Sequence, residues 1–201
     1  MITNTIKLNF GVQPGDEIPH DVINAYKAGN SGAIGNWIHE QYNGYLNYQI
    51  SEGPDMIIGN LPLEVKSKEV SSKNTSWTIG TTSTKQIVTC DYENTSLANK
   101  SKYLILVGYD IKRFNCIMSV DLVDISNPDV QQDLKEYYEI SQRHILHNFN
   151  KKAKPYEKMG DSKGVYFERS AISESWAWRV TPAAMKKFIS YSNLYSNPLF
   201  D

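Results

Sequence analysis

Apolar residues in the first quarter of the chain recur at helical spacing. Ile34 and Ile38 belong to a stripe of positions three and four residues apart, which is typical of one face of an amphipathic helix. The pattern predicts helix over about residues 21–45, interrupted at the Gly- and Asn-containing run 29–32. Ser31 is expected to cap the second part of this helix.

The period then changes to the alternation that indicates β-strands. Strands are predicted at residues 46–50, 55–58, 61–68, 76–80, 103–109 and 114–125. Gly59-Asn60 is expected to form the tight turn that joins two of them into a hairpin. The run 103–109 is almost wholly apolar, which indicates a strand buried on both faces.

The last third of the chain predicts alternating helices and short strands. After Asn127-Pro128 we expect a long helix (129–148), a polar surface loop (151–163), two short strands (165–167 and 176–180) and a final helix (183–192). Thr181-Pro182 begins that last helix, because Pro is favoured at the first helical position.

This order of elements predicts an α/β fold, with a central mixed β-sheet flanked by helices. A length of 201 residues fits a single domain. We expect a catalytic core at about residues 21–125, with residues 126–201 serving recognition or dimerisation.

Composition and charge exclude several classes of protein. The apolar and charged fractions are those of ordinary globular chains, and the formal net charge of −1 shows no basic excess. No apolar run is long enough to span a bilayer and no signal-peptide pattern opens the chain, so we expect a cytoplasmic protein without membrane contact. Cys90 and Cys116 are expected to be free thiols.

The predicted hairpin carries two carboxylates and a lysine. Asp55 lies on its first strand, and Glu64 and Lys66 lie on its second. Side chains alternate along a strand, so Glu64 and Lys66 share one face while Val65 points into the core. Carboxylate and carbonyl oxygens are the ligands that Mg²⁺ prefers, which makes Asp55, Glu64 and the backbone carbonyl of Val65 candidate ligands.

Pro54-Asp55 followed by Glu64-Val65-Lys66 resembles the PD-(D/E)xK motif of the restriction-endonuclease-like nucleases. The resemblance implies that Asp55 and Glu64 bind Mg²⁺, that Lys66 positions or activates the nucleophile, and that a mixed sheet lies between helices. Many members also have a glutamate on the preceding helix, and Glu40 occupies that place here as a further metal or structural partner.

The segment after the motif is rich in lysine and hydroxyl side chains. Two interpretations stand: an ordinary strand and turn, in which Ser and Thr are common, or contacts to the phosphates and base edges of DNA. The candidate DNA-binding residues are Lys68, Lys73, Thr81, Thr82, Ser83 and Lys85.

These features together predict a type II restriction endonuclease, which cuts double-stranded DNA at a specific sequence with Mg²⁺. A homodimer is expected, because one active site cuts one strand and two-fold DNA sites match two-fold proteins. The alternatives are a structure-specific, repair or nicking nuclease of the same superfamily, and a non-catalytic DNA-binding module.

Overall fold

The computed structural model describes residues 11–42, 55–58, 61–70, 76–99, 102–148, 157–160, 164–170 and 175–194. The chain divides into two compact units. The first consists of Met1–Lys73, Tyr103–Val123 and Ile189–Asp201, and the second of Asn74–Lys102 and Asp124–Phe188. Part of the expected core of residues 21–125 therefore belongs with the C-terminal half of the chain.

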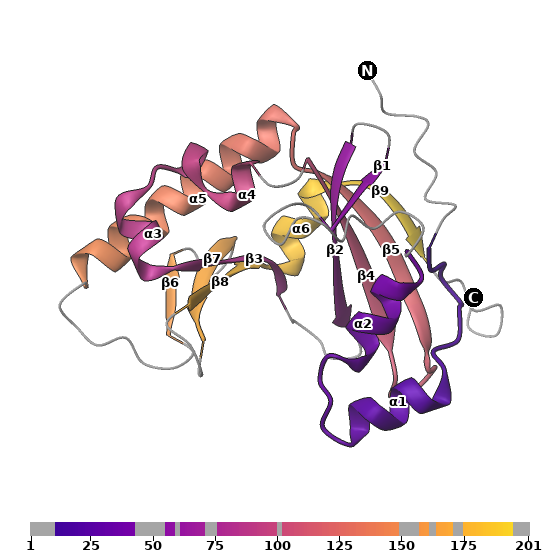
Figure 1. The fold of residues 1–201 in the computed structure, drawn as a ribbon. Helices are drawn as coiled ribbons and strands as arrows, with labels where there is room; N and C mark the ends of the chain where they lie inside the picture. Colours follow the sequence, from indigo (N-terminus) through magenta and orange to yellow (C-terminus); the bar gives the residue numbers. More distant parts are fainter. Residues whose placement is uncertain are drawn as a thin grey trace. The chain divides into compact units, whose positions relative to one another are not determined.

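The first unit is built on a five-stranded sheet with the order β1-β2-β4-β5-β9 (Figure 1). Its strands are β1 (Met56–Ile58), β2 (Leu61–Glu69), β4 (Tyr103–Asp110), β5 (Cys116–Asp124) and β9 (Ile189–Leu194). β1 pairs with β2 and β5 with β9 in antiparallel fashion, whereas β2 and β4 run parallel. The sheet is therefore mixed, as predicted.

Two short helices, α1 (His20–Lys27) and α2 (Ala33–Glu40), belong to the same unit, and α2 packs on β2. Ile34 and Ile38 of α2 join Leu63 and Val65 of β2 in one buried cluster. Gly35 permits the close approach, since a Cβ there would lie 3.3 Å from Ser67 Oγ. One face of β2 is thus committed to the core beneath α2.

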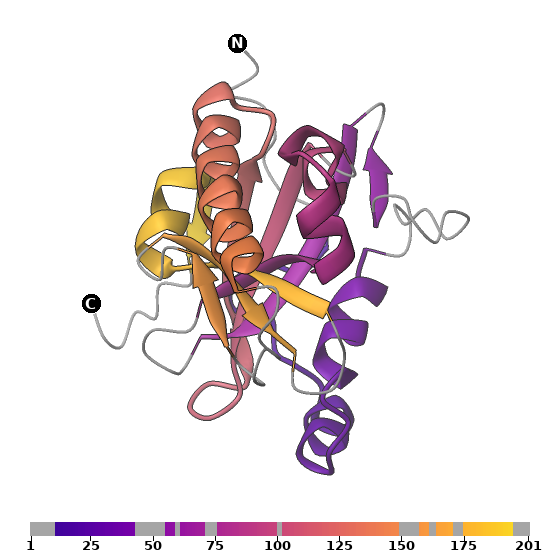
Figure 2. The ribbon, with the colours of Figure 1, turned by 90° about the vertical axis from the view of Figure 1, so that its left-hand side faces the viewer.

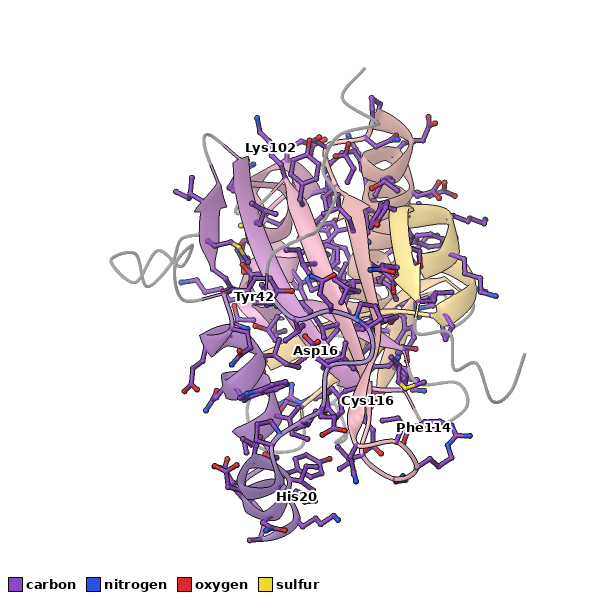
Figure 3. The ribbon with its side chains drawn as sticks, turned by 90° about the vertical axis from the view of Figure 1, so that its right-hand side faces the viewer. Asp16, His20, Tyr42, Lys102, Phe114 and Cys116 are labelled. Atoms are coloured by element: carbon purple, nitrogen blue, oxygen red, sulfur yellow. The ribbon has the colours of Figure 1, made fainter. Side chains whose placement is uncertain are left out.

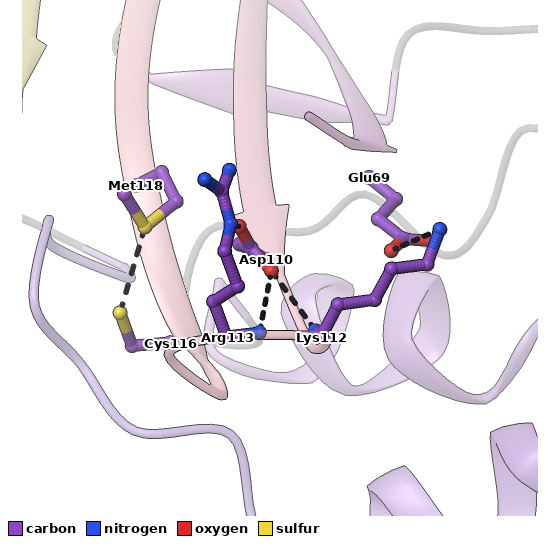
Figure 4. Close-up of polar contacts among 6 residues, drawn as sticks. All are labelled: Glu69, Asp110, Lys112, Arg113, Cys116 and Met118. Carbon is purple, nitrogen blue, oxygen red and sulfur yellow. Dashed lines mark hydrogen bonds and ion pairs between the residues drawn. The ribbon is translucent and has the colours of Figure 1, made fainter. Parts of the chain in front are cut away.

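The turn between β4 and β5 is held by the buried side chain of Asp110 (Figure 4). Its Oδ1 accepts the backbone N–H groups of Lys112 (2.9 Å) and Arg113 (3.0 Å), and its Oδ2 accepts Arg113 Nε–H at 3.0 Å. Asn115 completes the turn with a φ of 53°, a conformation that Asn tolerates better than most residues. Beside the start of β5, near Cys116, runs the segment that contains Asp16 (Figure 3).

The second unit is built on a four-stranded antiparallel sheet with the order β3-β8-β7-β6 (Figure 2). Its strands are β3 (Trp77–Ser83), β6 (Lys158–Gly160), β7 (Val165–Arg169) and β8 (Ser175–Val180). The helical elements of this unit are α3 (Thr84–Thr89), η2 (Tyr92–Asn94), α4 (Ser96–Asn99), α5 (Pro128–His147) and α6 (Pro182–Phe188). The long helix α5 packs on β6 and β7 and contacts α3.

Aromatic rings fill the core of the second unit. Tyr138 of α5 stacks on Trp178 of β8 with ring centroids 5.3 Å apart, and Phe167 of β7 meets the same indole edge-on at 4.7 Å. The Tyr138 hydroxyl donates to the carbonyl of Cys90 at 2.7 Å, so its polar end is satisfied although the ring is buried. Burial raises the pKa of this hydroxyl to about 12.

The predicted mixed α/β class is confirmed, but several local predictions are wrong. The last helix ends at Phe188 instead of continuing to 192, and Ile189–Leu194 forms β9. This segment contains β-branched, aromatic and small polar residues, and β5 offers it unpaired backbone groups. Helix α2 begins after Gly32, not Ser31, because Asn30 Oδ1 accepts the Gly32 N–H and forms a local turn.

Four further elements were not anticipated: β6, α3, η2 and α4. β6 lies inside the run 151–163 that was expected to be a loop, and it pairs with β7. α3 follows β3 directly, with Ser83 as its cap. The predicted strand 46–50 and the turn at 59–60 lie outside the described residues.

The structure also bears on the cysteines and on the apolar character of the helices. Cys90 and Cys116 are free thiols, as predicted. In the part of the chain that the structure describes, no helix has both the length and the apolar character needed to cross a membrane.

Candidate functional site

The β1–β2 hairpin brings the two predicted carboxylates together. Its register pairs Met56 with Leu63 and Ile58 with Leu61. Continued by one residue, the same register sets Asp55 opposite Glu64. Directly opposed residues of an antiparallel pair have Cβ atoms about 4.5–5.5 Å apart, so both carboxylates can reach a common ligand.

The two faces of this hairpin differ in polarity, although Glu64 is itself buried. Met56, Leu63 and Val65 point to one face and are almost fully buried in the core beneath α2. Glu64 and Lys66 alternate with them and therefore occupy the opposite face. The predicted alternation along β2, with Val65 in the core and Glu64 and Lys66 on the other face, is confirmed.

Lys66 is ion-paired to Glu64 on that face. Lys66 Nζ lies 2.5 Å from Glu64 Oε1, and the two side chains are 27% and 7% exposed. A buried carboxylate needs a charged or hydrogen-bonding partner to be stable as an anion, and Lys66 supplies one. Its partly exposed ammonium also borders solvent, where a substrate can approach.

Asp55 is held against β2 by a backbone hydrogen bond. Its Oδ2 accepts the Val65 N–H at 2.8 Å. β1 begins only at Met56, so the carboxylate accepts an N–H at the point where the ladder with β1 has stopped. The sequence predicted a role for the Val65 backbone through its carbonyl; the structure adds that the Val65 N–H positions Asp55. The carbonyl as a metal ligand stays a prediction.

Glu40 is not brought together with these residues. It is exposed at the last position of α2, the helix that packs on the face of β2 opposite Glu64 and Lys66. Within the described segments, no three His, Cys, Asp or Glu side chains are grouped closely enough to hold a metal ion. A role for Glu40 as a metal partner remains an expectation from the resemblance.

The predicted DNA-binding residues fall into different places. Lys68 is partly buried and follows Lys66 by two residues on the same strand, hence on the same face. Lys73 lies outside the described residues. Thr81, Thr82, Ser83 and Lys85 belong to the second unit.

Two of those hydroxyl groups already serve the fold of the second unit. Thr82 is buried, and its hydroxyl donates to Gln86 Oε1 at 2.7 Å. Ser83 Oγ accepts the Gln86 N–H at 3.1 Å and caps α3. Thr81, Ser83 and Lys85 are exposed, and because the Ser83 oxygen already caps α3, Thr81 and Lys85 are the best placed of the four to meet a ligand.

The donor set on the hairpin fits a hard divalent cation. It consists of carboxylate oxygens from two opposed strands, which is the chemistry Mg²⁺ selects. Asp55 Oδ2 accepts the Val65 N–H, and Glu64 Oε1 accepts the Lys66 ammonium. The ammonium of Lys66 adds a positive charge beside the two carboxylates.

One buried acid of the first unit was not singled out from the sequence. Asp121 of β5 is 7% exposed, and its Oδ1 accepts the Ser192 hydroxyl of β9 at 2.5 Å. Burial raises the pKa of this carboxyl, and the hydroxyls of Ser192 and Ser119 oppose that rise. An acid in the middle of an apolar strand was the available signal. Its contacts explain it as part of the fold.

Comparison with protein-family models and with curated proteins gives no match for this chain.

Proposed function

We propose that this protein is a Mg²⁺-dependent endodeoxyribonuclease that cuts double-stranded DNA at a specific sequence, as type II restriction enzymes do. The observation that carries the proposal is the hairpin register, which sets Asp55 opposite Glu64 with Lys66 ion-paired beside them. Phosphodiester hydrolysis needs this combination, since an anionic phosphate must be approached by a water and its developing charge must be offset.

Each residue has a definable part in that chemistry. Asp55 and Glu64 would hold Mg²⁺, which when bound lowers the pKa of a water and polarises the phosphate. The Val65 N–H fixes the Asp55 carboxylate through its 2.8 Å hydrogen bond. Lys66, on the same face as Glu64, orients the attacking water or contacts the scissile phosphate with its ammonium. The buried core beneath β2 keeps these groups on a rigid element.

Sequence specificity requires surface beyond the hairpin. Thr81 and Lys85 are exposed in the second unit, and Lys68 continues the polar face of β2. Hydroxyl and ammonium groups contact phosphates and base edges in DNA complexes. A homodimer belongs to the proposal, because two equivalent sites would cut both strands of a two-fold DNA sequence.

A direct test is to incubate the purified protein with plasmid or phage DNA and Mg²⁺, and to sequence the ends produced. Discrete fragments with a common end sequence are the expected result. Cleavage should stop in EDTA, and Ca²⁺ should support DNA binding without cutting. Cutting that persists unchanged in EDTA would overturn the metal requirement, and a preference for branched DNA would favour the structure-specific nuclease.

Variants of the two carboxylates separate DNA cleavage from DNA binding. We expect Asp55→Asn and Glu64→Gln to lose cleavage by at least about a hundredfold while DNA binding is retained. Glu69→Gln is a matched control, because Glu69 lies at the far end of the same strand and pairs with Lys112 at 3.6 Å (Figure 4). Full cleavage by Asp55→Asn would show that the hairpin carboxylates do not carry the chemistry, and DNA binding without cleavage by the wild type would leave the non-catalytic DNA-binding module as the better interpretation.

A further inference from the structure

An exposed apolar side chain lies beside the carboxylates. Ile57 is 42% exposed, whereas its neighbour Met56 is fully buried. The register pairs Ile57 with Pro62, so these two side chains share the face that carries Glu64. The polar face of the hairpin therefore begins with a small apolar patch formed by Ile57 and Pro62.

The position of this patch follows from strand geometry. Ile57 is two residues from Asp55, which corresponds to about 6.6 Å along the strand. It is the diagonal neighbour of Glu64, and such neighbours are about 7–8 Å apart. Any phosphate held beside the two carboxylates would thus have its adjoining sugar within reach of Ile57.

Isolated apolar residues are ordinary on protein surfaces, but this one is in an unusual place. Among the strands that the structure describes, β1 lies at the edge of its sheet, and exposed edge positions are commonly protected by charged side chains. Here the outward position of a three-residue edge strand is isoleucine, next to a pair of carboxylates. Four exposed large apolar side chains are known in the described segments, and Ile57 is the one on the hairpin.

We propose that Ile57, with Pro62, contacts the sugar next to the scissile phosphate and selects deoxyribose over ribose. A 2′-hydroxyl pressed against this patch would lose water and find no hydrogen-bond partner there. Such a loss should lower kcat/KM by roughly 10- to 100-fold, which corresponds to about 1.4–2.8 kcal/mol. The 2′-hydroxyl is the group by which proteins distinguish RNA from DNA. This inference rests on the proposed nuclease function.

The test uses duplexes in which one ribonucleotide replaces a deoxyribonucleotide on either side of the cleaved bond. For the wild-type protein we expect at least one of these substitutions to lower kcat/KM by about 10- to 100-fold. Ile57→Val and Ile57→Thr are nearly isosteric variants that differ by a hydroxyl. Ile57→Val should keep the discrimination, and Ile57→Thr should reduce it to about threefold or less. Leu146→Thr, at an exposed apolar position of the second unit, is a control that should leave the ratio unchanged.

The possible outcomes separate this inference from the proposed function. Equal cleavage of both substrates by the wild type overturns the inference, as does equal discrimination by Ile57→Val and Ile57→Thr. In either case the loss of cleavage in Asp55→Asn would still stand. If the wild type cuts no DNA with Mg²⁺, the proposed function fails and this inference fails with it. Both Ile57 variants retain β-branched side chains suited to a strand, and thermal unfolding checks that they fold.

Discussion

Each unit of the molecule contains a half-buried ion pair on a β-sheet, and the two pairs differ in how far apart their partners lie along the chain. In the first unit, Lys66 contacts Glu64 two residues away on the same strand. In the second, Arg179 of β8 reaches Glu168 on the neighbouring strand β7. One pair is local in sequence and the other connects separate strands.

All three nitrogens of the Arg179 guanidinium donate hydrogen bonds. Its Nε and Nη2 both donate to Glu168 Oε1, at 3.1 and 2.7 Å, and its Nη1 donates to Thr78 Oγ1 of β3 at 2.5 Å. The guanidinium therefore joins β3, β8 and β7 through one planar group, which suits the rigid geometry of arginine. Such an arrangement stabilises the sheet and leaves little capacity for a ligand.

The Lys66 pair is built differently. An ammonium has three donors, and the described contact to Glu64 uses one of them. A bond between residues two positions apart joins no separate strands, so its part in the fold is to stabilise a buried carboxylate. The Arg179 pair therefore connects strands of a sheet, whereas the Lys66 pair sets a partly exposed lysine beside a buried carboxylate on one strand.

The largest expected difference between the two pairs is in catalysis. Lys66→Met should lower cleavage by about 10²–10⁴-fold, because a positioned group that handles the water or the phosphate is lost. The free energy of unfolding should also fall, by about 1–3 kcal/mol, because the buried Glu64 carboxylate loses its cationic partner. Single-turnover cleavage and urea unfolding of the same preparation measure both. Lys112→Met is the control, since Lys112 is an exposed partner of Glu69.

Arg179 is expected to affect stability without affecting catalysis. Arg179→Met should lower the free energy of unfolding by about 1–3 kcal/mol, because it leaves the largely buried Glu168 carboxylate without its main partner. Lys158→Met removes a more exposed cation 3.9 Å from the same carboxylate and should cost less than about 1 kcal/mol. A loss of cleavage in folded Arg179→Met as large as that in Lys66→Met would contradict the distinction between the pairs.

The local half of this distinction could be predicted from the sequence. Alternation along one strand predicted that Glu64 and Lys66 lie on the other face from Val65, without knowledge of any other strand. The hairpin that sets Asp55 beside them was also predictable, because its strands are close in sequence and differ clearly in apolar pattern. These features depend on neighbours only a few residues away.

The non-local half could not be predicted in the same way. β3 pairs with β8, and the opposed residues Trp77 and Val180 are about a hundred residues apart in the sequence. Nothing in the local pattern of β3 specifies that partner. β9 was mistaken for the end of a helix because its strand character depends on the free edge of β5. The hydrogen bond from Val65 N–H to Asp55 was missed because it depends on where β1 begins.

Asp121 is a second buried carboxylate in the unit that contains Glu64. Its hydrogen-bond donors are the neutral hydroxyls of Ser192 and Ser119, whereas Glu64 has a charged lysine. Because burial raises the pKa of Asp121, its contribution to stability is fully present below the unfolded value of 3.8 and declines as pH rises through the folded value. Ser192→Ala removes a donor to the charged form. We expect it to cost about 1.5–3 kcal/mol at pH 7 and about 1 kcal/mol near pH 4, measured by urea unfolding.

Ser190→Ala is the matched control for this pH dependence. The Ser190 hydroxyl donates to the Leu122 carbonyl at 3.0 Å on the same pair of strands, and that acceptor does not titrate. Its cost should therefore be about 1 kcal/mol at both pH values. A loss for Ser192→Ala that is independent of pH would show that the hydroxyl does not stabilise the Asp121 carboxylate.

The smallest expected effect concerns Ser83, whose hydroxyl oxygen serves the fold by capping α3. Ser83→Ala should lower the free energy of unfolding by about 1 kcal/mol, because the Gln86 N–H at the start of α3 loses its acceptor. Ser83→Asp should retain stability, since a carboxylate is an equally good cap and favours a helix N-terminus. Urea unfolding separates the two variants. DNA affinity measured on the same pair then decides between the two interpretations of the hydroxyl-rich segment: a phosphate contact at Ser83 predicts that Asp weakens binding more than Ala, whereas a purely structural serine predicts equal affinities.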